Sequence, residues 1–202
     1  MADGAGAERS PQNGAERGSQ GVLVLCTANV CRSPAAAALL RRRLAGARPA
    51  VPVSSAGLLP GGSPALPEMR AVMDGYGADL ASHVSRTVAA PDLAGAALVI
   101  AMAREHLRHA VVLAPECWPV AFTLKELLRR GERAGARRPG ETLPGWLARV
   151  HEGREKRALL GASPEDDVLD PAGGPPEGYA ATAGLLDRLT ARLAGLCLAP
   201  GG

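Results

Sequence analysis

Apolar and polar residues follow two different patterns along this chain, one typical of strands and one typical of helices. Apolar runs of strand length predict four strands, the last of them weak, at residues 21–25, 51–56, 96–102 and 111–113. Between these runs apolar residues recur at helical spacing, which predicts a helix that opens at Arg104 and others over 34–45, 67–76, 122–130, 143–160 and 179–197. We therefore expect a three-layer α/β sandwich around a central, mainly parallel four-stranded sheet.

Length and composition fit one domain preceded by a tail. The chain has 202 residues, of which 47% are hydrophobic, and this suffices for a sizeable core. Residues 1–20 are polar and rich in glycine and alanine, so we expect a disordered N-terminal tail there. The domain itself is expected over residues 21–198.

Charge and aromatic content argue against a nucleic-acid partner. The formal net charge is +3, and one Phe, two Tyr and two Trp offer few surfaces on which bases could stack. No apolar run reaches the roughly 18 residues of a membrane helix, and residues 1–20 lack the apolar centre of a signal peptide. We therefore expect a cytoplasmic protein with reduced cysteines that neither binds nucleic acid nor inserts into a membrane.

The strongest chemical pattern follows the first strand. A loop that starts at Cys26 and ends at Arg32 joins this strand to a helix with Pro34 near its start. Inward-pointing N–H groups of such a loop and the positive end of the helix form a cradle for a dianionic oxyanion. The same field stabilises the thiolate of Cys26, which is its nucleophilic form. Arg32 adds a planar fork that can hold two phosphoryl oxygens.

Two polar side chains support this loop. Ser33 is placed to donate a hydrogen bond to the sulfur of Cys26. Asn29 tolerates a left-handed backbone and can brace the loop through its amide. Because the loop amides and Arg32 already neutralise the charge of a phosphoryl group, and the sequence contains no cluster of metal ligands, we expect no metal and no other cofactor.

These residues resemble those of the low-molecular-weight protein tyrosine phosphatases, including their bacterial members. The run Cys26-Thr-Ala-Asn-Val-Cys-Arg-Ser-Pro34 is similar to the signature loop of that family, in which glycine is usual at the position of Ala28. The resemblance extends over most of residues 21–198 and implies a phosphatase-I-like fold. It also implies that the phosphoryl group is bound by Thr27, Ala28, Asn29, Val30, Cys31 and Ser33.

The resemblance includes a late Asp-Pro dipeptide, Asp170-Pro171. In the family such a dipeptide supplies the general acid, so the resemblance implies that Asp170 protonates the leaving oxygen while Pro171 restrains the loop. Asp167 is the rival candidate, but no proline follows it. Cys26, Arg32 and Asp170 then predict a phosphomonoester hydrolase with a cysteinyl-phosphate intermediate. Its partner would be a phosphorylated protein, with phosphotyrosine favoured, or a small phosphate ester.

Departures from the family pattern keep other functions open. Aromatic residues often line the cleft in relatives, yet Leu58-Leu59 and Ala172-Gly173 stand at the corresponding places, and Ala103 stands where an acidic residue is common. A phosphoarginine or small-molecule phosphatase and a non-catalytic phosphate-binding module are therefore alternatives. Val30 favours phosphotyrosine, because relatives that act on phosphoarginine have threonine there.

The remaining cysteines bear on two further hypotheses. A thiol-dependent arsenate reductase shares this fold and loop but needs resolving cysteines, and only Cys117 and Cys197 follow the loop. In relatives the pair that corresponds to Cys26 and Cys31 forms a disulfide under oxidant, so the resemblance implies a protective redox switch.

Two further segments are interpreted from the resemblance. His83, in the run Ser82-His83-Val84-Ser85-Arg86, is more consistent with a structural turn residue than with a catalytic base. Residues 131–166 are longer than the corresponding segment of the shortest relatives, which predicts an insertion or a lid.

Overall fold

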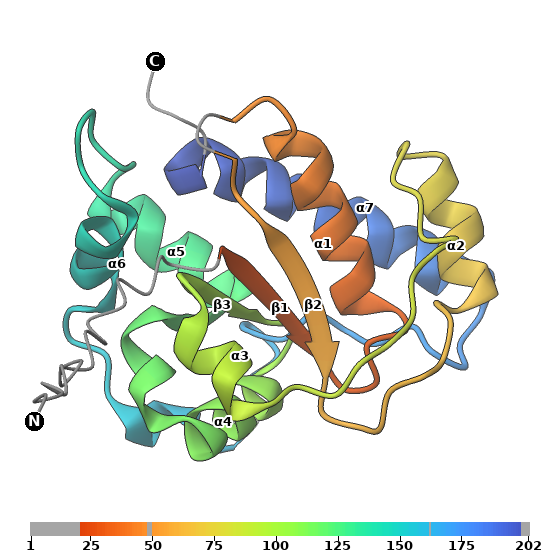
Figure 1. Cartoon of the computed structure of the whole chain (residues 1–202), viewed down its shortest axis with the longest axis horizontal. Coiled ribbons are helices and arrows are strands. Elements are labelled where there is room, and N and C mark those ends of the chain that lie inside the picture. The colour runs from red at the N-terminus through yellow and green to blue at the C-terminus, as the bar shows by residue number, and fades with distance from the viewer. Residues whose placement is uncertain (1–20, 48–49, 162, 199–202) are drawn as a thin grey trace, which may run out of the picture.

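The structure is a computed structural model that describes residues 21–47, 50–161 and 163–198 (Figure 1). The tail predicted over residues 1–20 lies outside the described residues. Among the described residues, no helix is both long and apolar enough to cross a bilayer.

Four parallel strands form one sheet in the order β2, β1, β3, β4. Their bounds are β1 Val22–Cys26, β2 Val53–Gly57, β3 Leu98–Ala101 and β4 Ala121–Thr123. Because the strands run in the same direction, their carboxyl ends share one edge of the sheet, where Cys26 lies beside Gly57 in register. The predicted α/β class with a parallel four-stranded sheet is confirmed.

Helices connect the strands and cover both faces of the sheet. They are α1 Arg32–Leu44, α2 Pro67–Asp74, α3 Ala90–Gly95, α4 Arg104–Leu113, α5 Leu124–Ala134, α6 Leu143–His151 and α7 Pro176–Leu193. Short turns of 3₁₀-helix are η1 Pro115–Val120 and η2 Lys156–Leu159, and a π-helical turn, η3, covers Ala194–Leu198.

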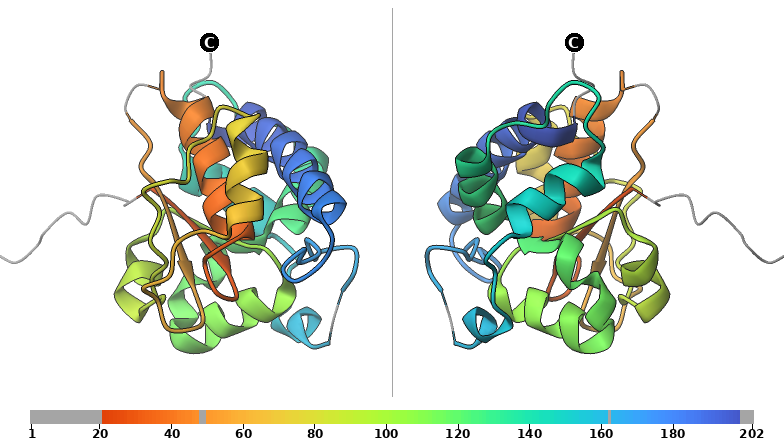
Figure 2. Two further views of the ribbon diagram at one scale, coloured as in Figure 1. Left: turned by 90° about the vertical axis from the view of Figure 1, so that its right-hand side faces the viewer. Right: turned by 90° about the vertical axis from the view of Figure 1, so that its left-hand side faces the viewer.

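The core lies on both faces of the sheet because side chains along a strand point alternately to opposite sides. Val22 and Val24 join one buried cluster with α1, α2, α5, α6 and α7, whereas Leu23 and Leu25 join another with α3 and α4. Figures 1 and 2 show α1, α2 and α7 on one side of the sheet and α3 and α4 on the other. The arrangement is the expected three-layer sandwich.

The predicted fourth strand at residues 111–113 is wrong. These residues form the last turn of α4, because Val111 continues the buried stripe of Leu107 and Ala110 against the sheet. The fourth strand is instead Ala121–Thr123, which pairs with β3. Thr123 then caps α5, since its side chain accepts the Glu126 N–H.

The helix predicted over 143–160 is shorter than expected. It ends at His151, and Gly153 then adopts a φ of +71°, which turns the chain before η2. Trp146 of α6 is fully buried, and a Cβ on Gly131 would lie 2.8 Å from Cζ2 of its ring. This part of the 131–166 segment therefore packs into the core. Its interpretation as an insertion or a lid stays a prediction.

Candidate active site

The loop from Cys26 to Arg32, called here the nucleophile loop, joins β1 to α1 at the carboxyl edge of the sheet. Cys26 is 2% exposed, and its Sγ lies 2.9 Å from Oγ of Ser33. Since the hydroxyl of Ser33 can donate to a thiolate, it can stabilise the charged sulfur as the sequence predicts. Val30 and Ala28 lie half-buried in the same loop.

Asn29 is the central brace of the nucleophile loop. Its φ is +56°, the only positive value at a non-glycine residue in the described part of the chain. Its side-chain Nδ2 donates to Oγ of Ser33 and of Ser55, both at 2.9 Å, and its Oδ1 accepts the Arg86 N–H at 3.1 Å. His83 donates from Nε2 to the Asn29 carbonyl at 2.6 Å, a contact that fits its interpretation as a structural residue.

Gly57, at the end of β2, allows the nucleophile loop to approach the neighbouring strand. A Cβ at this position would lie 2.8 Å from the Asn29 nitrogen, 2.8 Å from the Thr27 carbonyl oxygen and 2.9 Å from the Ala28 carbonyl carbon. No real side chain tolerates such distances to three backbone atoms. Beyond Gly57, Leu58 donates its N–H to the Thr27 carbonyl at 2.7 Å.

Arg32 connects the nucleophile loop to the late loop that carries the predicted acid. It is 4% exposed, its Nη1 donates to the Val168 carbonyl at 3.2 Å, and its Nη2 donates to Thr27 Oγ1 at 3.1 Å and to Asp170 Oδ2 at 2.5 Å. Its Nε is buried and has no hydrogen-bond partner among the described residues. An anion bound in the loop would supply the missing acceptor.

Residues 166–170, called here the acid loop, separate the two candidate acids. Asp170 forms the ion pair with Arg32 while its side chain stays 41% exposed. Asp167 instead accepts the Arg104 N–H at 2.8 Å and thus caps α4, whose first position follows Ala103, a residue with no capping side chain. The structure therefore brings Asp170 to the nucleophile loop and gives Asp167 a structural contact.

Asp166 anchors the acid loop to two helices. Its carboxylate pairs with Arg104 at 2.8 Å and with Arg129 at 2.7 Å, and its side chain is 4% exposed. Burial alone would raise the pKa of Asp166, but the hydrogen bonds from Arg129 and Arg104 outweigh it and hold the pKa below its usual value. The anchor is therefore ionised at neutral pH.

Cys31 differs from Cys26 in its surroundings. It is 3% exposed and precedes the first residue of α1. Burial, together with the charges of Asp170 and Cys26, raises the pKa of Cys31 to about 12, so it is a protonated thiol. All four cysteines are free.

Sequence reasoning did not assign His106, Arg86 or Gly57 to the site, yet all three contact the nucleophile loop. His106 follows β3 at the same edge of the sheet, and its Nε2 lies 2.9 Å from Thr27 Oγ1. The sequence feature that could have revealed His106 is a histidine in the first turn of a helix that starts at this edge.

Among the described residues, no group of three or more His, Cys, Asp and Glu could hold a metal ion.

A cavity of about 280 Å³ adjoins Arg32 and Asp170. The start of α4 and the acid loop line most of it, through Ala103, Arg104, Glu105, Arg108, Asp167, Val168 and Leu169. Its described lining contains no aromatic side chain. The loss of the aromatic cleft walls expected at Leu58-Leu59 and Ala172-Gly173 stays a prediction, because none of these residues lines this cavity.

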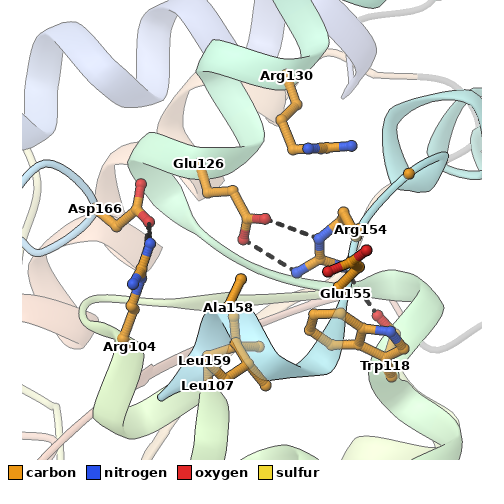
Figure 3. Close-up of a pocket in the computed structure, with 11 residues that line it drawn as sticks. Arg104, Leu107, Trp118, Glu126, Arg130, Arg154, Glu155, Ala158, Leu159 and Asp166 are labelled. Atoms are coloured by element: carbon orange, nitrogen blue, oxygen red, sulfur yellow. Dashed lines mark hydrogen bonds and ion pairs between the residues drawn. The ribbon is translucent and has the colours of Figure 1, made fainter. Parts of the chain in front are cut away.

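A second cavity, of about 160 Å³, lies behind the acid loop (Figure 3). Figure 3 shows Glu126 facing Arg154 above the ring of Trp118, and Asp166 facing Arg104 at the side. Each charged group that lines it has a partner. Besides the two ion pairs in Figure 3, Arg130 donates to two backbone carbonyls, and Glu155 pairs with Arg157. The charged side chains that line this cavity are therefore paired with other protein groups rather than free for a ligand.

Comparisons with known proteins place the chain in one family. The family model described as low molecular weight phosphotyrosine protein phosphatase matches residues 21–134. The chain belongs to this family, and both the resemblance and the fold class expected from the sequence are confirmed.

Individual relatives include enzymes named for two different substrates. The low molecular weight protein-tyrosine-phosphatase Etp of Escherichia coli K12 is 38% identical over 98 residues, which are 47% of this chain and 62% of that protein. The match thus spans less than two thirds of that relative. The protein-arginine-phosphatase of Geobacillus stearothermophilus is 30% identical over 174 residues, 86% of this chain and 93% of that protein. The crystal structure of a low molecular weight protein tyrosine phosphatase from T. tengcongensis is 32% identical, with a TM-score of 0.64 over 87% of this chain and 97% of that one.

Proposed function

We propose that this protein hydrolyses phosphomonoesters through a cysteinyl-phosphate intermediate. The observation that carries the proposal is a loop that starts at the buried Cys26 thiol and ends at Arg32, whose guanidinium has a free Nε and pairs with the Asp170 carboxylate. Membership of the phosphatase family supports it. The proposed phosphoryl-binding residues remain those of the nucleophile loop and Ser33.

In the proposed first step, the Cys26 thiolate attacks phosphorus in line with the leaving oxygen. The S–P bond forms while the P–O bond breaks, the loop N–H groups and Arg32 hold the equatorial oxygens, and Asp170 gives its proton to the leaving oxygen. In the second step Asp170 takes a proton from water, which attacks the cysteinyl phosphate. This releases inorganic phosphate and restores the thiolate.

The ion pair between Arg32 and Asp170 gives the first step an order of events. A phosphate dianion entering the nucleophile loop competes with the Asp170 carboxylate for Nη2 of Arg32. Displacement frees the carboxyl group of Asp170 to turn toward the leaving oxygen, where it acts as the proposed general acid.

The experiment that tests this function is Cys26→Ser, assayed with an aryl phosphate. We expect turnover to be abolished while orthophosphate or vanadate still binds, because Arg32 and the loop N–H groups remain. Binding is measured by calorimetry and turnover by release of phosphate. Activity near wild type in Cys26→Ser would contradict the covalent step, and binding without turnover in the wild type would indicate a phosphate-binding module.

Phosphotyrosine in a protein is the substrate we favour, and phosphoarginine is the second candidate. Val30 and the relative Etp support the first. The second is supported by the protein-arginine-phosphatase, whose match covers 93% of that protein, and by the aliphatic and charged lining beside Arg32. The ratio of kcat/KM for two peptides that differ only in phosphotyrosine or phosphoarginine decides between them.

The buried and separate positions of Cys117 and Cys197 do not favour the arsenate reductase alternative.

We also propose that oxidation joins Cys26 and Cys31 reversibly and protects the nucleophile. The four free thiols support a reducing, cytoplasmic setting in which such a switch would matter. Inactivation by mild peroxide should be reversed by a dithiol, and Cys31→Ser should make it irreversible because Cys26 then proceeds to sulfinic acid. Mass spectrometry after peroxide treatment should find the Cys26–Cys31 linkage, and its absence would contradict the switch.

A further inference from the structure

His106 is a buried polar residue that the proposed reaction does not yet use. It lies in the first turn of α4 and is 0% exposed. Its Nε2 is 2.9 Å from Oγ1 of Thr27, and the same oxygen accepts a hydrogen bond from Arg32 Nη2 at 3.1 Å. Three side chains thus form a continuous path from α4 to the guanidinium that would hold the phosphoryl group.

The chemistry of the partners favours one direction for these hydrogen bonds. Nε2 of His106 also lies 3.2 Å from Oε1 of Glu105, and because a carboxylate oxygen can only accept, this neighbour favours the tautomer with the proton on Nε2. Burial, with smaller effects from the charges of Arg32 and His109, lowers the pKa of His106 to about 3. The ring is therefore neutral at pH 7, and its Nδ1 has no partner among the described residues, which suits the tautomer with the proton on Nε2 because an unpaired acceptor costs less than an unpaired donor.

The hydroxyl group of Thr27 then accepts two hydrogen bonds and can still donate one. Its hydroxyl oxygen accepts from His106 and from Arg32, which occupies both lone pairs. Its own proton is directed elsewhere, and Thr27 lies immediately after Cys26 in the nucleophile loop. An oxygen of a phosphoryl group bound in that loop is a suitable acceptor.

The contact with Thr27 gains importance when substrate binds. Arg32 has three acceptors in this structure, and Asp170 is the one that a phosphate dianion would displace. The Val168 carbonyl and the Thr27 hydroxyl then remain to set the plane of the guanidinium. The Arg32 guanidinium can bind two phosphoryl oxygens at once only if its plane has the right orientation.

We propose that His106 is a positioning residue: acting through Thr27, it fixes the plane of the Arg32 guanidinium and aims the Thr27 hydroxyl at the bound phosphoryl group. The proposal rests on the proposed function, because it assigns Arg32 to phosphoryl binding. A residue that served only to fill the space under the loop would be replaceable by any side chain of similar size.

The test compares orthophosphate binding, measured by calorimetry, in His106→Leu and His106→Gln. Leucine fills a similar volume without a donor, and we expect about tenfold weaker binding, the effect of one lost hydrogen bond near a charged group. The glutamine amide can place an N–H close to Nε2 of the histidine, so binding should stay within about threefold of wild type. His109→Leu, on the exposed side of the same helix, is the matched control and should change nothing.

A double-mutant cycle with Thr27 tests the path itself. Thr27→Val should also weaken orthophosphate binding about tenfold, and the double variant Thr27→Val/His106→Leu should bind no more weakly than either single variant, because the two residues act in series. Unchanged binding in His106→Leu, or losses that add in the double variant, would overturn the proposal. If His106→Leu does not fold, His106→Asn replaces it, since its amide is too short to reach Thr27, and unchanged binding there is equally decisive.

Orthophosphate binding separates this proposal from the proposed function. The cycle is repeated in the Cys26→Ser background, where no covalent step takes place. A wild type that binds orthophosphate but hydrolyses no phosphomonoester would contradict the proposed function, while the pattern of the binding losses would still decide the role of His106.

Discussion

The nucleophile loop and the acid loop meet at Arg32 but are held in place by different forces. The nucleophile loop has no exposed residue, and neutral hydrogen bonds of the Asn29 and Ser33 side chains together with the close approach to Gly57 fix its backbone. The acid loop is held by charge, because Asp166 pairs with two arginines from distant helices. Beyond this anchor, Leu169 is 82% exposed and Asp170 is 41% exposed at its side chain.

This difference suits the two tasks proposed for the loops. A cradle for a phosphoryl group must keep its N–H groups aimed at one point, and neutral contacts in a buried site hold such geometry without dependence on salt. An acid must exchange its ion pair with Arg32 for a contact with the leaving oxygen, which requires an exposed and adjustable end. Substitutions that change one loop at a time test this difference.

Among substitutions outside the nucleophile itself, removing the proposed acid should have the largest effect, and one that depends on the substrate. Asp170→Asn should slow hydrolysis of phosphotyrosine or an alkyl phosphate by about 10²-fold or more, and that of a nitrophenyl ester by less, because an activated leaving oxygen needs little protonation. Steady-state kinetics with a series of leaving groups measures the difference.

Asp167→Asn is the matched control for that experiment. The asparagine oxygen can still accept the Arg104 N–H, so kcat should stay within about threefold of wild type for every leaving group. Equal losses for all leaving groups in Asp170→Asn, or a leaving-group effect in Asp167→Asn instead, would show that the acid is assigned to the wrong residue.

Gly57→Ala should damage the nucleophile loop without touching the acid loop. The added Cβ must displace three backbone atoms, and displacement of the loop by about 1 Å should lower kcat/KM by about 10²-fold for all leaving groups alike. The free energy of unfolding should fall by about 1–3 kcal/mol, as for other overpacked sites. Gly46→Ala, where nothing lies within 4 Å, is the control, and similar losses in both variants would refute the steric explanation.

Asp166→Asn should have the smallest effect on activity and a pH-dependent effect on stability. We expect a loss of about 1–3 kcal/mol in the free energy of unfolding at neutral pH, since two charged hydrogen bonds are weakened. Because the pKa of Asp166 is lower in the folded protein than in the unfolded chain, its contribution is complete above the unfolded value of about 3.9 and is lost as the pH falls through the folded value.

Urea unfolding of wild type and Asp166→Asn between pH 7 and pH 3 measures this contribution. The stability difference should be constant down to about pH 5 and should shrink below pH 4. Glu165→Gln changes an exposed neighbouring acid and should stay within about 0.5 kcal/mol of wild type. A difference that is independent of pH would mean that Asp166 acts through its shape rather than its charge.

The sequence alone determined the residues of the nucleophile loop. Asn29 and Ser33 are four residues apart, and Cys26 and Ser33 are seven apart, so these two contacts form within one strand–loop–helix segment. Short-range contacts of this kind follow from residue types and spacing. The apolar pattern likewise predicted the three-layer fold, because alternating strands and helices have few ways to bury their apolar faces.

Only the tertiary structure decided which distant residues reach that loop. Arg32 and Asp170 are 138 residues apart, and which acidic side chain reaches Arg32 depends on where the chain runs after β4 and α5. The sequence misplaced that fourth strand at residues 111–113, because local pattern does not reveal whether Val111 packs as part of a helix or of a strand. The positions of His106 and Gly57 beneath the loop follow from the order of the strands in the sheet, a long-range property that neither spacing nor composition encodes.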